Sequence, residues 1–339
     1  MSHNLMHDIQ KGLDEKRLEL GRWLETAPPG EKEILLGAQG ESVVQTHLHV
    51  MDETLEKIGE GALGVCTVCH GIVDDNLLQM DYTSCVCLDH YSAQERRDLE
   101  NELELSQVVQ RALLPQQVPY MVGMDIAAFS RPAQIVSGDY FDFLRFNDGT
   151  HGLVVGDVSG KGMSAGMLMS SLQTAFHALV PESDSPVKVL EKINRLYIHN
   201  INFTTFATIF FGKIDPGKRT LAYASAGHNP AFLYRPTQKH GEWLQPTGAA
   251  IGLMEQFDVQ LRNVQLESND VLLLYTDGVT EAFDRQNQQY GPERLAGVIE
   301  RNEGLPAGEL IQKALGSLND FVEGQLLQDD ITLVVCKIQ

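Results

Sequence analysis

The sequence has no long apolar run. Nowhere in its 339 residues does a stretch approach the roughly 18 uninterrupted apolar residues that a membrane helix needs. The first ten residues are polar and lack the apolar core of a secretory signal peptide. Both absences lead us to expect a cytoplasmic protein that does not act at a membrane.

Positive charge is scarce. The chain has 26 Lys and Arg against 46 Asp and Glu, which gives a formal net charge of -20. A field of this sign repels nucleic acid and anionic membranes, so we expect no direct contact with either. It also gathers divalent cations, although an acidic surface that serves solubility alone explains the charge equally well.

Internal repeats and low-complexity tracts are absent too. The 43% apolar and 21% charged residues are ordinary for a soluble globular protein, and the length allows two or three domains. The pattern divides the chain into a helical hairpin (1–60), a Cys-containing module (61–91), a helical linker (92–118) and a large domain (119–339).

Two helical segments form the hairpin, the first with an apolar stripe among charged residues, and the breaker Pro28-Pro29-Gly30 separates them. The second run extends from 31 to about 58, and a pair of dimerisation helices without chemistry is the alternative. A further helix is expected over 92–114, ending before Pro115. Its apolar residues form a seam that is short and irregular for a coiled coil.

The large domain alternates between strand and helix patterns. Strands are expected at 152–157, 205–214, 220–226, 231–235, 271–275 and 331–338, and helices at 164–179, 186–200 and 292–301. Ser164 is the expected N-cap of the first of these helices. Many strands with few helices predict an α+β sandwich, in which helices cover packed sheets.

Aspartates stand where several of these strands end or begin: Asp157, Asp277, the pair Asp329 and Asp330, and Asp139 in a fourth segment. Converging carboxylates repel one another unless a cation neutralises them. Their oxygens suit Mg²⁺ or Mn²⁺, and two such ions can activate water against a phosphoryl group. An Asp-Gly pair at a strand end is, taken alone, more often a plain turn, and spacing does not show convergence.

Rival motifs fit less well. Residues 156–161 (GDVSGK) have one residue too few between the glycines for a nucleotide-binding P-loop, and Gly162 stands where Ser or Thr is needed. Ser159 does not fit a nucleophile elbow. His228 is either an acid near a leaving group or, with Asn229, part of a turn between strands.

Residues 120–339 resemble the SpoIIE/RsbU-type branch of the PPM phosphatases, which is related to protein phosphatase type 2C. Five motifs occur in the family's order: VSGDYFD at 136–142, VGDVSGKG at 155–162, ASAGHNP at 224–230, YTDGVTE at 275–281 and QDDIT at 328–332. The resemblance implies a β-sandwich flanked by helices and a Mn²⁺- or Mg²⁺-dependent protein serine/threonine phosphatase. Its substrate is expected to be a phosphorylated regulator such as a STAS-domain anti-anti-sigma factor.

The resemblance also implies which residues hold two Mn²⁺ or Mg²⁺ ions. Asp157 matches the bridging ligand, and Asp277 and Asp329 complete the expected catalytic set. The carbonyl of Val158 and the carboxylate of Asp139 are further ligands. Asp330, the second member of its pair, stays open as a ligand.

Cysteine is rare, with five in the chain, and four fall between 66 and 87. A CxxC at 66–69 and a CxxH at 87–90, with seventeen residues between them, predict one structural Zn²⁺. The expected ligands are Cys66, Cys69, Cys87 and His90. Cys85 competes for the fourth place, His70 is more remote, and free reduced thiols are the alternative. Cys336 lies in an apolar run and is expected to be buried in a strand.

Residues 58–69 resemble the DksA/TraR-type zinc finger, which also follows a helical hairpin. This raises an alternative function, in which the N-terminal module binds the transcription machinery. The hairpin tip at 26–32 lacks the acidic pair of that family, which favours a structural or sensory input module. The linker, including QRALLP at 110–115, resembles the regulatory linker of this phosphatase class, so we expect it to form a homodimer and to control the metal site.

Overall fold

The computed structural model describes residues 40–73, 86–87, 90, 92–160, 162–200, 206–255, 257–325 and 328–339, with isolated positions at 10, 13–14, 17–18 and 21. The chain forms two compact units, which meet along the chain between Asn101 and Glu102. The finer boundaries expected at 60, 91 and 118 stay predictions. No helix among the described residues is long and apolar enough to cross a bilayer.

The first unit contains α3 (Gly40–Gly59) and a small turn structure in which Val65 pairs with Ile72. α3 is the second helix expected of the hairpin, and Arg17, one of the few described helical residues before it, forms an ion pair with Asp52 of α3. Most of the first expected helix lies outside the described residues. α5 (Ala93–Leu113) is the expected linker helix, and it ends before Pro115 as predicted.

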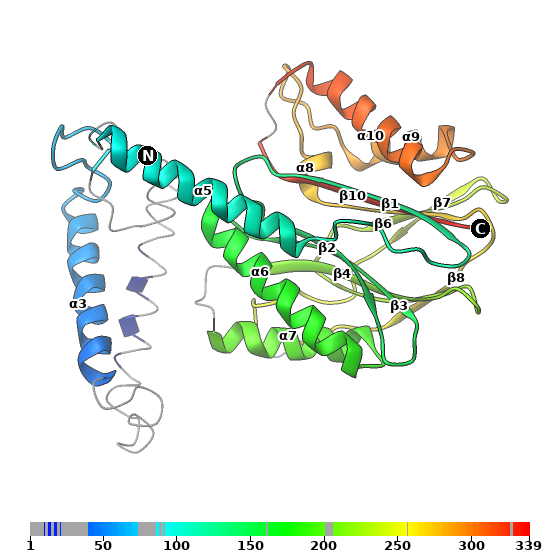
Figure 1. The fold of residues 1–339 in the computed structure, drawn as a ribbon, viewed down its shortest axis with the longest axis horizontal. Coiled ribbons are helices and arrows are strands. Elements are labelled where there is room, and N and C mark those ends of the chain that lie inside the picture. The colour runs from blue at the N-terminus through cyan, green and yellow to red at the C-terminus, as the bar shows by residue number, and fades with distance from the viewer. Residues whose placement is uncertain are drawn as a thin grey trace. The chain divides into compact units, whose positions relative to one another are not determined.

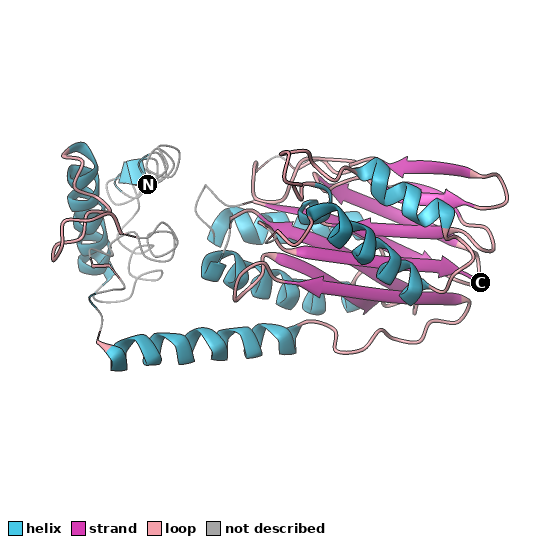
Figure 2. Cartoon of the chain, turned by 90° about the horizontal axis from the view of Figure 1, so that it is seen from above, coloured by secondary structure: helices cyan, strands magenta, loops and turns pink. Residues whose placement is uncertain are grey.

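The second unit is built from two antiparallel sheets of five strands (Figures 1 and 2). One sheet has the order β1 (Met124–Arg131), β10 (Ile331–Ile338), β9 (Val271–Tyr275), β6 (Ala231–Arg235) and β7 (His240–Leu244). The other has the order β2 (Asp139–Arg145), β3 (His151–Val158), β4 (Ala207–Asp215), β5 (Thr220–Ala226) and β8 (Arg262–Gln265).

Helices cover the outer faces of both sheets (Figure 1). α6 (Gly162–Leu179) and α7 (Pro186–Asn200) lie against the β2–β8 sheet, joined by the 3₁₀ turn Val180–Glu182. α9 (Pro292–Arg301) and α10 (Ala307–Val322) lie against the other sheet. The short α8 (Asp277–Thr280) follows β9 directly. The α+β sandwich flanked by helices is therefore the observed fold of this unit.

Alternation along the strands creates the layers of the core. In β9, Leu272 and Leu274 point between the sheets, while Leu273 points to the helices. The same alternation in the other strands gives one apolar layer between the sheets and one under each helix pair. Cys336 lies in the inter-sheet layer and is fully buried, as expected.

Several expected elements are confirmed residue for residue, among them β5, β6, β9, β10, α7 and α9. The expected N-cap at Ser164 is wrong, because α6 begins at Gly162 and Ser164 lies inside its first turn. Several elements were not expected, β2 and the short α8 among them. β7 and β8 are partly exposed strands at sheet edges and carry a weak apolar pattern, whereas β1 and the amphipathic α10 carried signals that the sequence reading did not use.

Candidate metal centre and comparisons with known proteins

Two aspartates lie opposite each other at one end of the sandwich. Asp139 opens β2 and Asp157 lies near the end of β3, and the antiparallel register pairs them directly. Phe141, two residues after Asp139, and Val155, two residues before Asp157, belong to the inter-sheet core. Because alternate side chains share a face, both carboxylates lie on the inter-sheet face at the same end of the sandwich.

The carboxyl group of Asp139 is almost completely buried, with 1% of the residue exposed. Its Oδ2 accepts a hydrogen bond from Thr276 Oγ1 at 2.8 Å. Burial and the charges of Asp157 and Asp330 raise the pKa of Asp139 well above its usual range, and hydrogen bonds from Thr332 and Thr276 oppose that rise. The site therefore concentrates negative charge where water is excluded.

Thr276 connects three strands at this point. Its hydroxyl, besides donating to Asp139 of β2, accepts a hydrogen bond from the backbone N–H of Thr332 at 2.9 Å. The Thr276 N–H in turn donates to the Thr332 carbonyl at 3.1 Å. Sequence reasoning missed both threonines, although each stands inside a matched motif, within two residues of a predicted aspartate.

The segments that carry Asp277 and Asp329 pass very close to each other. A Cβ added at Gly278 would lie 1.9 Å from the Asp330 carbonyl oxygen, so only glycine permits this approach. Asp329 Oδ1 accepts a hydrogen bond from the N–H of Asp330 at 3.0 Å, which fixes the turn before β10. The structure thus brings the predicted segments of Asp277 and of the Asp329–Asp330 pair together at the end of the sandwich.

Asp330 has a different set of partners. Its carboxylate accepts hydrogen bonds from the N–H of Ala133 at 2.7 Å, the N–H of Gly138 at 2.8 Å and the hydroxyl of Ser137 at 2.7 Å. These three bonds hold the loop that precedes β2. The second aspartate of the pair therefore fastens the loop before Asp139 to the start of β10.

The backbone of Val158 contacts the same loop at Gly138. Its N–H donates to the Gly138 carbonyl at 3.2 Å. A Cβ at Gly138 would lie 2.8 Å from the Val158 carbonyl oxygen and 3.4 Å from Asp157 Oδ1. Glycine at this position leaves space beside two oxygens that were predicted as metal ligands.

The donor set at this end of the sandwich fits Mn²⁺ or Mg²⁺. It consists of carboxylate and carbonyl oxygens, which are the hard ligands that these ions prefer. Burial, followed by the charges of Asp157 and Asp330, raises the pKa of Asp139, and a cation at this place would favour its ionised form. No three of the described carboxylates place one oxygen each within 4.8 Å of one another. This wider spacing is compatible with a two-metal site, because ligands distributed over two ions roughly 3.5 to 4 Å apart lie further from one another than the ligands of one ion.

His228 lies in the β5–β6 loop and is buried. Its Nδ1 is 3.0 Å from Thr208 Oγ1. Burial lowers the pKa of His228 to about 4, against an opposing contact with the backbone of Tyr275. A histidine that is neutral at pH 7 is a poor proton donor, which favours its role in shaping the turn over that of an acid.

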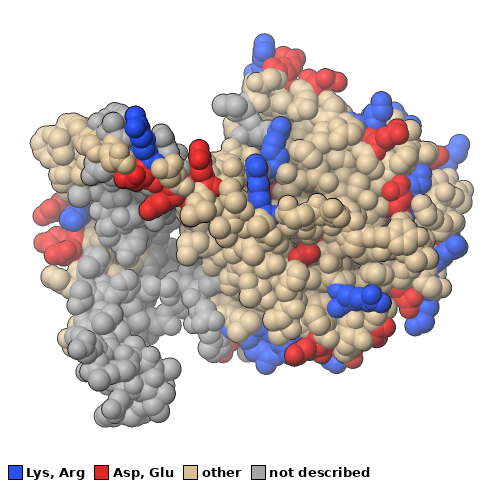
Figure 3. Space-filling view, viewed as in Figure 1, with Lys and Arg blue, Asp and Glu red and all other residues tan. Residues whose placement is uncertain are grey.

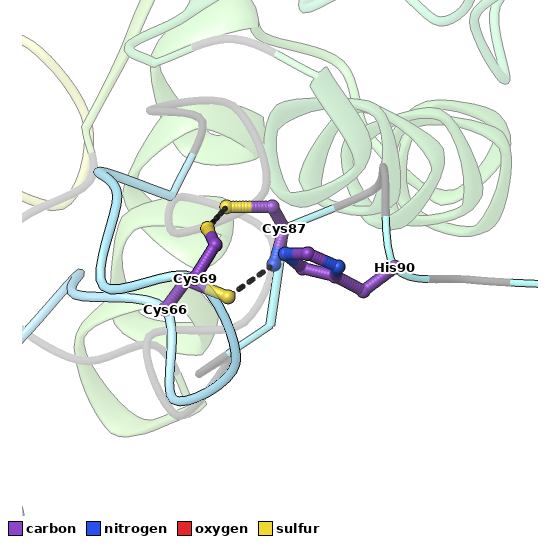
Figure 4. A group of neighbouring side chains, drawn as sticks. All are labelled: Cys66, Cys69, Cys87 and His90. Atoms are coloured by element: carbon purple, nitrogen blue, oxygen red, sulfur yellow. Dashed lines mark hydrogen bonds between the residues drawn. The ribbon is translucent and has the colours of Figure 1, made fainter.

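A second group of potential ligands lies in the first unit (Figure 4). Cys66, Cys69, Cys87 and His90 each place one ligand atom within 4.8 Å of all the others. The sulfurs of Cys69 and Cys87 are 3.9 Å apart. Cys85, the competing ligand, lies outside the described residues.

Backbone amides support these sulfurs. The N–H groups of Val68 and Cys87 each donate to Cys66 Sγ at 3.4 Å, and that of Gly71 donates to Cys69 Sγ at 3.4 Å. Although burial raises the pKa of the Cys66 thiol, backbone hydrogen bonds outweigh this and lower it to about 6. Burial and the neighbouring thiols raise the pKa of Cys87 to about 12. The group favours one thiolate and needs a cation to hold more.

His70, the remote candidate, is an exposed residue with φ of 55°. Its N–H donates to the Cys66 carbonyl at 2.9 Å and closes the turn after the first cysteine pair. Its side chain does not belong to the ligand group. Its role is therefore in the turn.

Comparisons with known proteins agree with the geometry of the second unit. The family model of stage II sporulation protein E (SpoIIE) matches residues 147–339. "Phosphoserine phosphatase RsbU" of Bacillus subtilis is 31% identical over 242 residues, which cover 71% of each chain.

Solved structures show the same fold. The structure of the RsbU and RsbW domains of Rv1364c from Mycobacterium tuberculosis is 28% identical, with a TM-score of 0.57, and the match covers 67% of this chain and 63% of that one. The SiaA-PP2C domain of Pseudomonas aeruginosa has a TM-score of 0.64 at 20% identity, over 73% of this chain and all of that one. The resemblance to the DksA/TraR-type zinc finger gains no support from these matches. The chain belongs to the SpoIIE family, and it is a PP2C-type protein serine/threonine phosphatase.

Proposed function

We propose that the chain hydrolyses phosphoserine or phosphothreonine in a phosphorylated regulatory protein, at a centre that holds two Mn²⁺ or Mg²⁺ ions. The residues that hold the ions are Asp139, Asp157, Asp277 and Asp329, with the carbonyl of Val158. The observation that carries this proposal is the buried, register-paired couple of Asp139 and Asp157. PP2C-type phosphatases use these metals, and the oxygen donors of the site suit them.

The ions, when bound, activate a water molecule and neutralise charge on the phosphoryl group. The chain's own residues keep the carboxylates in place. Thr276 fixes Asp139 through its hydroxyl, and Asp330 fastens the loop before Asp139. Burial keeps His228 neutral, so the chain does not rely on it as an acid.

An activity assay tests the centre. Asp157→Ala is expected to lower the rate on a phosphoserine peptide with Mn²⁺ by at least about 10³-fold, because several kcal/mol of transition-state stabilisation depend on the ions. The melting temperature should change little. Asp148→Asn, which removes a surface carboxylate paired with Lys213, is the control and should keep full activity. Retained activity in Asp157→Ala would overturn the proposal.

The substrate class that we propose is a phosphorylated STAS-domain anti-anti-sigma factor. The similarity to RsbU and to the RsbU part of a solved two-domain structure supports it. Phosphoproteomes of cells that carry wild type or Asp157→Ala provide the test. Phosphoserine or phosphothreonine should accumulate on a STAS-domain protein in the variant, and accumulation only on unrelated proteins would contradict this substrate.

For the first unit we propose one structural Zn²⁺, held by Cys66, Cys69, Cys87 and His90 in a DksA/TraR-like module. Mutual proximity of the four ligand atoms and N–H donation to two sulfurs support it. Metal analysis of the purified chain should find about one zinc ion per chain. His90→Asn should weaken zinc binding and lower this content. His70→Asn is the matched control, because asparagine tolerates the positive φ at that position.

We further propose that this module controls the phosphatase through α5 and that α5 forms a homodimer. Leu105, Val108 and Val109 of α5 are 63%, 62% and 53% exposed, which is unusual for three apolar residues within two turns. Sedimentation should show a dimer at micromolar concentration that Val108→Glu dissociates. A monomeric wild type would refute the dimer. No observation in the described part of the chain favours the alternative of binding the transcription machinery.

A further inference from the structure

Gln110 of α5 is buried, although glutamine is usually exposed on a helix. The residue is 7% exposed. Its Nε2 donates to the Ser137 carbonyl at 2.8 Å, and its Oε1 accepts from the Ser137 N–H at 2.8 Å. The side-chain amide therefore satisfies both backbone groups of one loop residue, as a neighbouring strand would.

Ser137 passes this contact on to the metal centre. Its hydroxyl accepts a hydrogen bond from the N–H of Asp139 at 3.0 Å and donates to Asp330 Oδ2 at 2.7 Å. Both functions of the hydroxyl are thus used. Hydrogen bonds thus run from Gln110 of α5 to Ser137, and from Ser137 to the backbone N–H of Asp139, a proposed metal ligand.

A glycine in α6 provides the space for the amide. A Cβ at Gly166 would lie 2.9 Å from Gln110 Nε2 and 3.2 Å from the Val136 side chain. Beside this contact, residues of α5 and α6 line a cavity of about 280 Å³, so apolar packing between the two helices is incomplete there. The hydrogen bonds of Gln110 therefore carry much of the attachment of α5 to the loop.

We infer that Gln110 is a positioning residue, whose amide sets the loop 136–139 and through it the carboxylate of Asp139. This inference rests on the proposed metal centre. Without the amide, the buried N–H and carbonyl of Ser137 lose their partners, and the loop must move to find others. The centre then binds its ions more weakly before the fold itself is lost.

Mn²⁺ titration of the full 339-residue chain, followed by calorimetry, tests the inference. Gln110→Met keeps the length and volume of the side chain but forms neither bond, and it is expected to weaken Mn²⁺ binding about tenfold, the effect of one to two buried hydrogen bonds. Gln107→Met is the matched control. Gln107 lies one turn earlier and donates a single bond, to the Ile135 carbonyl at 2.9 Å, so Mn²⁺ affinity should stay within about twofold.

A second variant covers the case in which Gln110→Met does not fold. Gly166→Ala leaves Gln110 in place and favours the helix, but it presses on the amide from α6. It should weaken Mn²⁺ binding in the same direction. A lower melting temperature with unchanged Mn²⁺ affinity, in whichever of the two variants folds, would show that the contact is merely structural and would overturn the inference.

Asp157→Asn, measured in the same titration, distinguishes failure of the proposed metal centre from failure of the positioning role of Gln110. If it removes Mn²⁺ binding while Gln110→Met and Gly166→Ala bind as wild type, the centre stands and the positioning role is wrong. If Asp157→Asn binds Mn²⁺ as wild type, the proposed centre itself is wrong, and the role of Gln110 falls with it.

Discussion

The two units of the chain are stabilised by different interactions. The phosphatase unit has three apolar layers, one between its sheets and one under each helix pair. In the described part of the first unit, the cluster around the cysteines contains only Cys66 and Val73, with Val86 and Cys87 packed against it. Burial of so few side chains around the cysteines contributes little against the conformational entropy of that segment, which is why we propose that a metal ion orders it.

The same contrast holds for the two groups of ligands. The four candidate zinc ligands lie within reach of a single ion. The candidate carboxylates of the phosphatase unit lie at one end of the sandwich. There Asp139 is buried, and hydrogen bonds hold it and the loop before it. In our proposal, a metal held by the first group would order the segment around it, whereas the fold of the phosphatase unit positions the second group. Charges of both signs border the visible face of the phosphatase unit, with a broad uncharged area between them (Figure 3).

Removal of the proposed zinc ion should produce the largest difference in stability between the two units. Structural zinc contributes on the order of 10 kcal/mol in small modules. A zinc-selective chelator is therefore expected to make the segment around Cys66 and Cys87 exchange its amide hydrogens at the rate of an unfolded chain. Amides of β3, β4 and β9 should stay protected in the same hydrogen-exchange experiment, and their simultaneous loss would mean that the units unfold as one.

A core truncation tests the opposite side of the comparison. Phe210 is fully buried between the sheets and stacks on Tyr223 with ring centroids 5.1 Å apart. Phe210→Ala should lower the free energy of unfolding by about 3 to 5 kcal/mol. Denaturant unfolding measures this loss, while the zinc content should remain that of wild type.

Tyr120→Ala is the control for that experiment, since the ring is 87% exposed. It should change stability by no more than about 0.5 kcal/mol. An equal loss in both variants would contradict the assignment of stability to the inter-sheet layer.

The metal centre itself should weaken the phosphatase unit. The folded pKa of Asp139 lies above its unfolded value, so ionisation of this carboxyl destabilises the fold as the pH rises through the folded pKa. Asp139→Asn keeps the size and removes the charge. We expect it to stabilise the metal-free protein by about 1 to 2 kcal/mol at pH 7, with a smaller gain at low pH, and to abolish the stabilisation that Mn²⁺ gives wild type. Thermal scans at several pH values, with and without Mn²⁺, measure both effects, and a loss of metal-free stability would contradict this reading.

An effect of similar size, but of opposite sign, is expected at Thr276. Thr276→Val keeps the shape of the side chain and removes the hydroxyl that joins Asp139 to the N–H of Thr332. Stability should fall by about 1 to 2 kcal/mol, as for other buried hydrogen bonds, and Mn²⁺ affinity should fall with it. Thr220→Val in β5 serves as the control in the same assays, and equal losses in both would show a general cost of the substitution.

Much of the phosphatase fold could be predicted from local patterns. Strands β9 and β10 are largely apolar runs, and α7 and α9 start at a proline, so their bounds were predicted to the residue. β7 and β8 lie at sheet edges and bury few side chains, so their patterns carried little signal. Ser164 was mistaken for a cap because a serine near a helix start is as compatible with the first turn as with the cap.

For the candidate site, the sequence determined which residues bear the chemistry: aspartates next to buried strands, and a CxxC and a CxxH pair with zinc-like spacing. Only the tertiary structure decided how they meet. The β2–β3 register places Asp139 opposite Asp157, and Gly278 lets two distant loops touch. Gln110 and Ser137 are 27 residues apart and joined by two bonds that no local pattern announces. Side-chain alternation and spacing are local properties, whereas register, loop approach and hydrogen bonding between elements depend on how the whole chain packs.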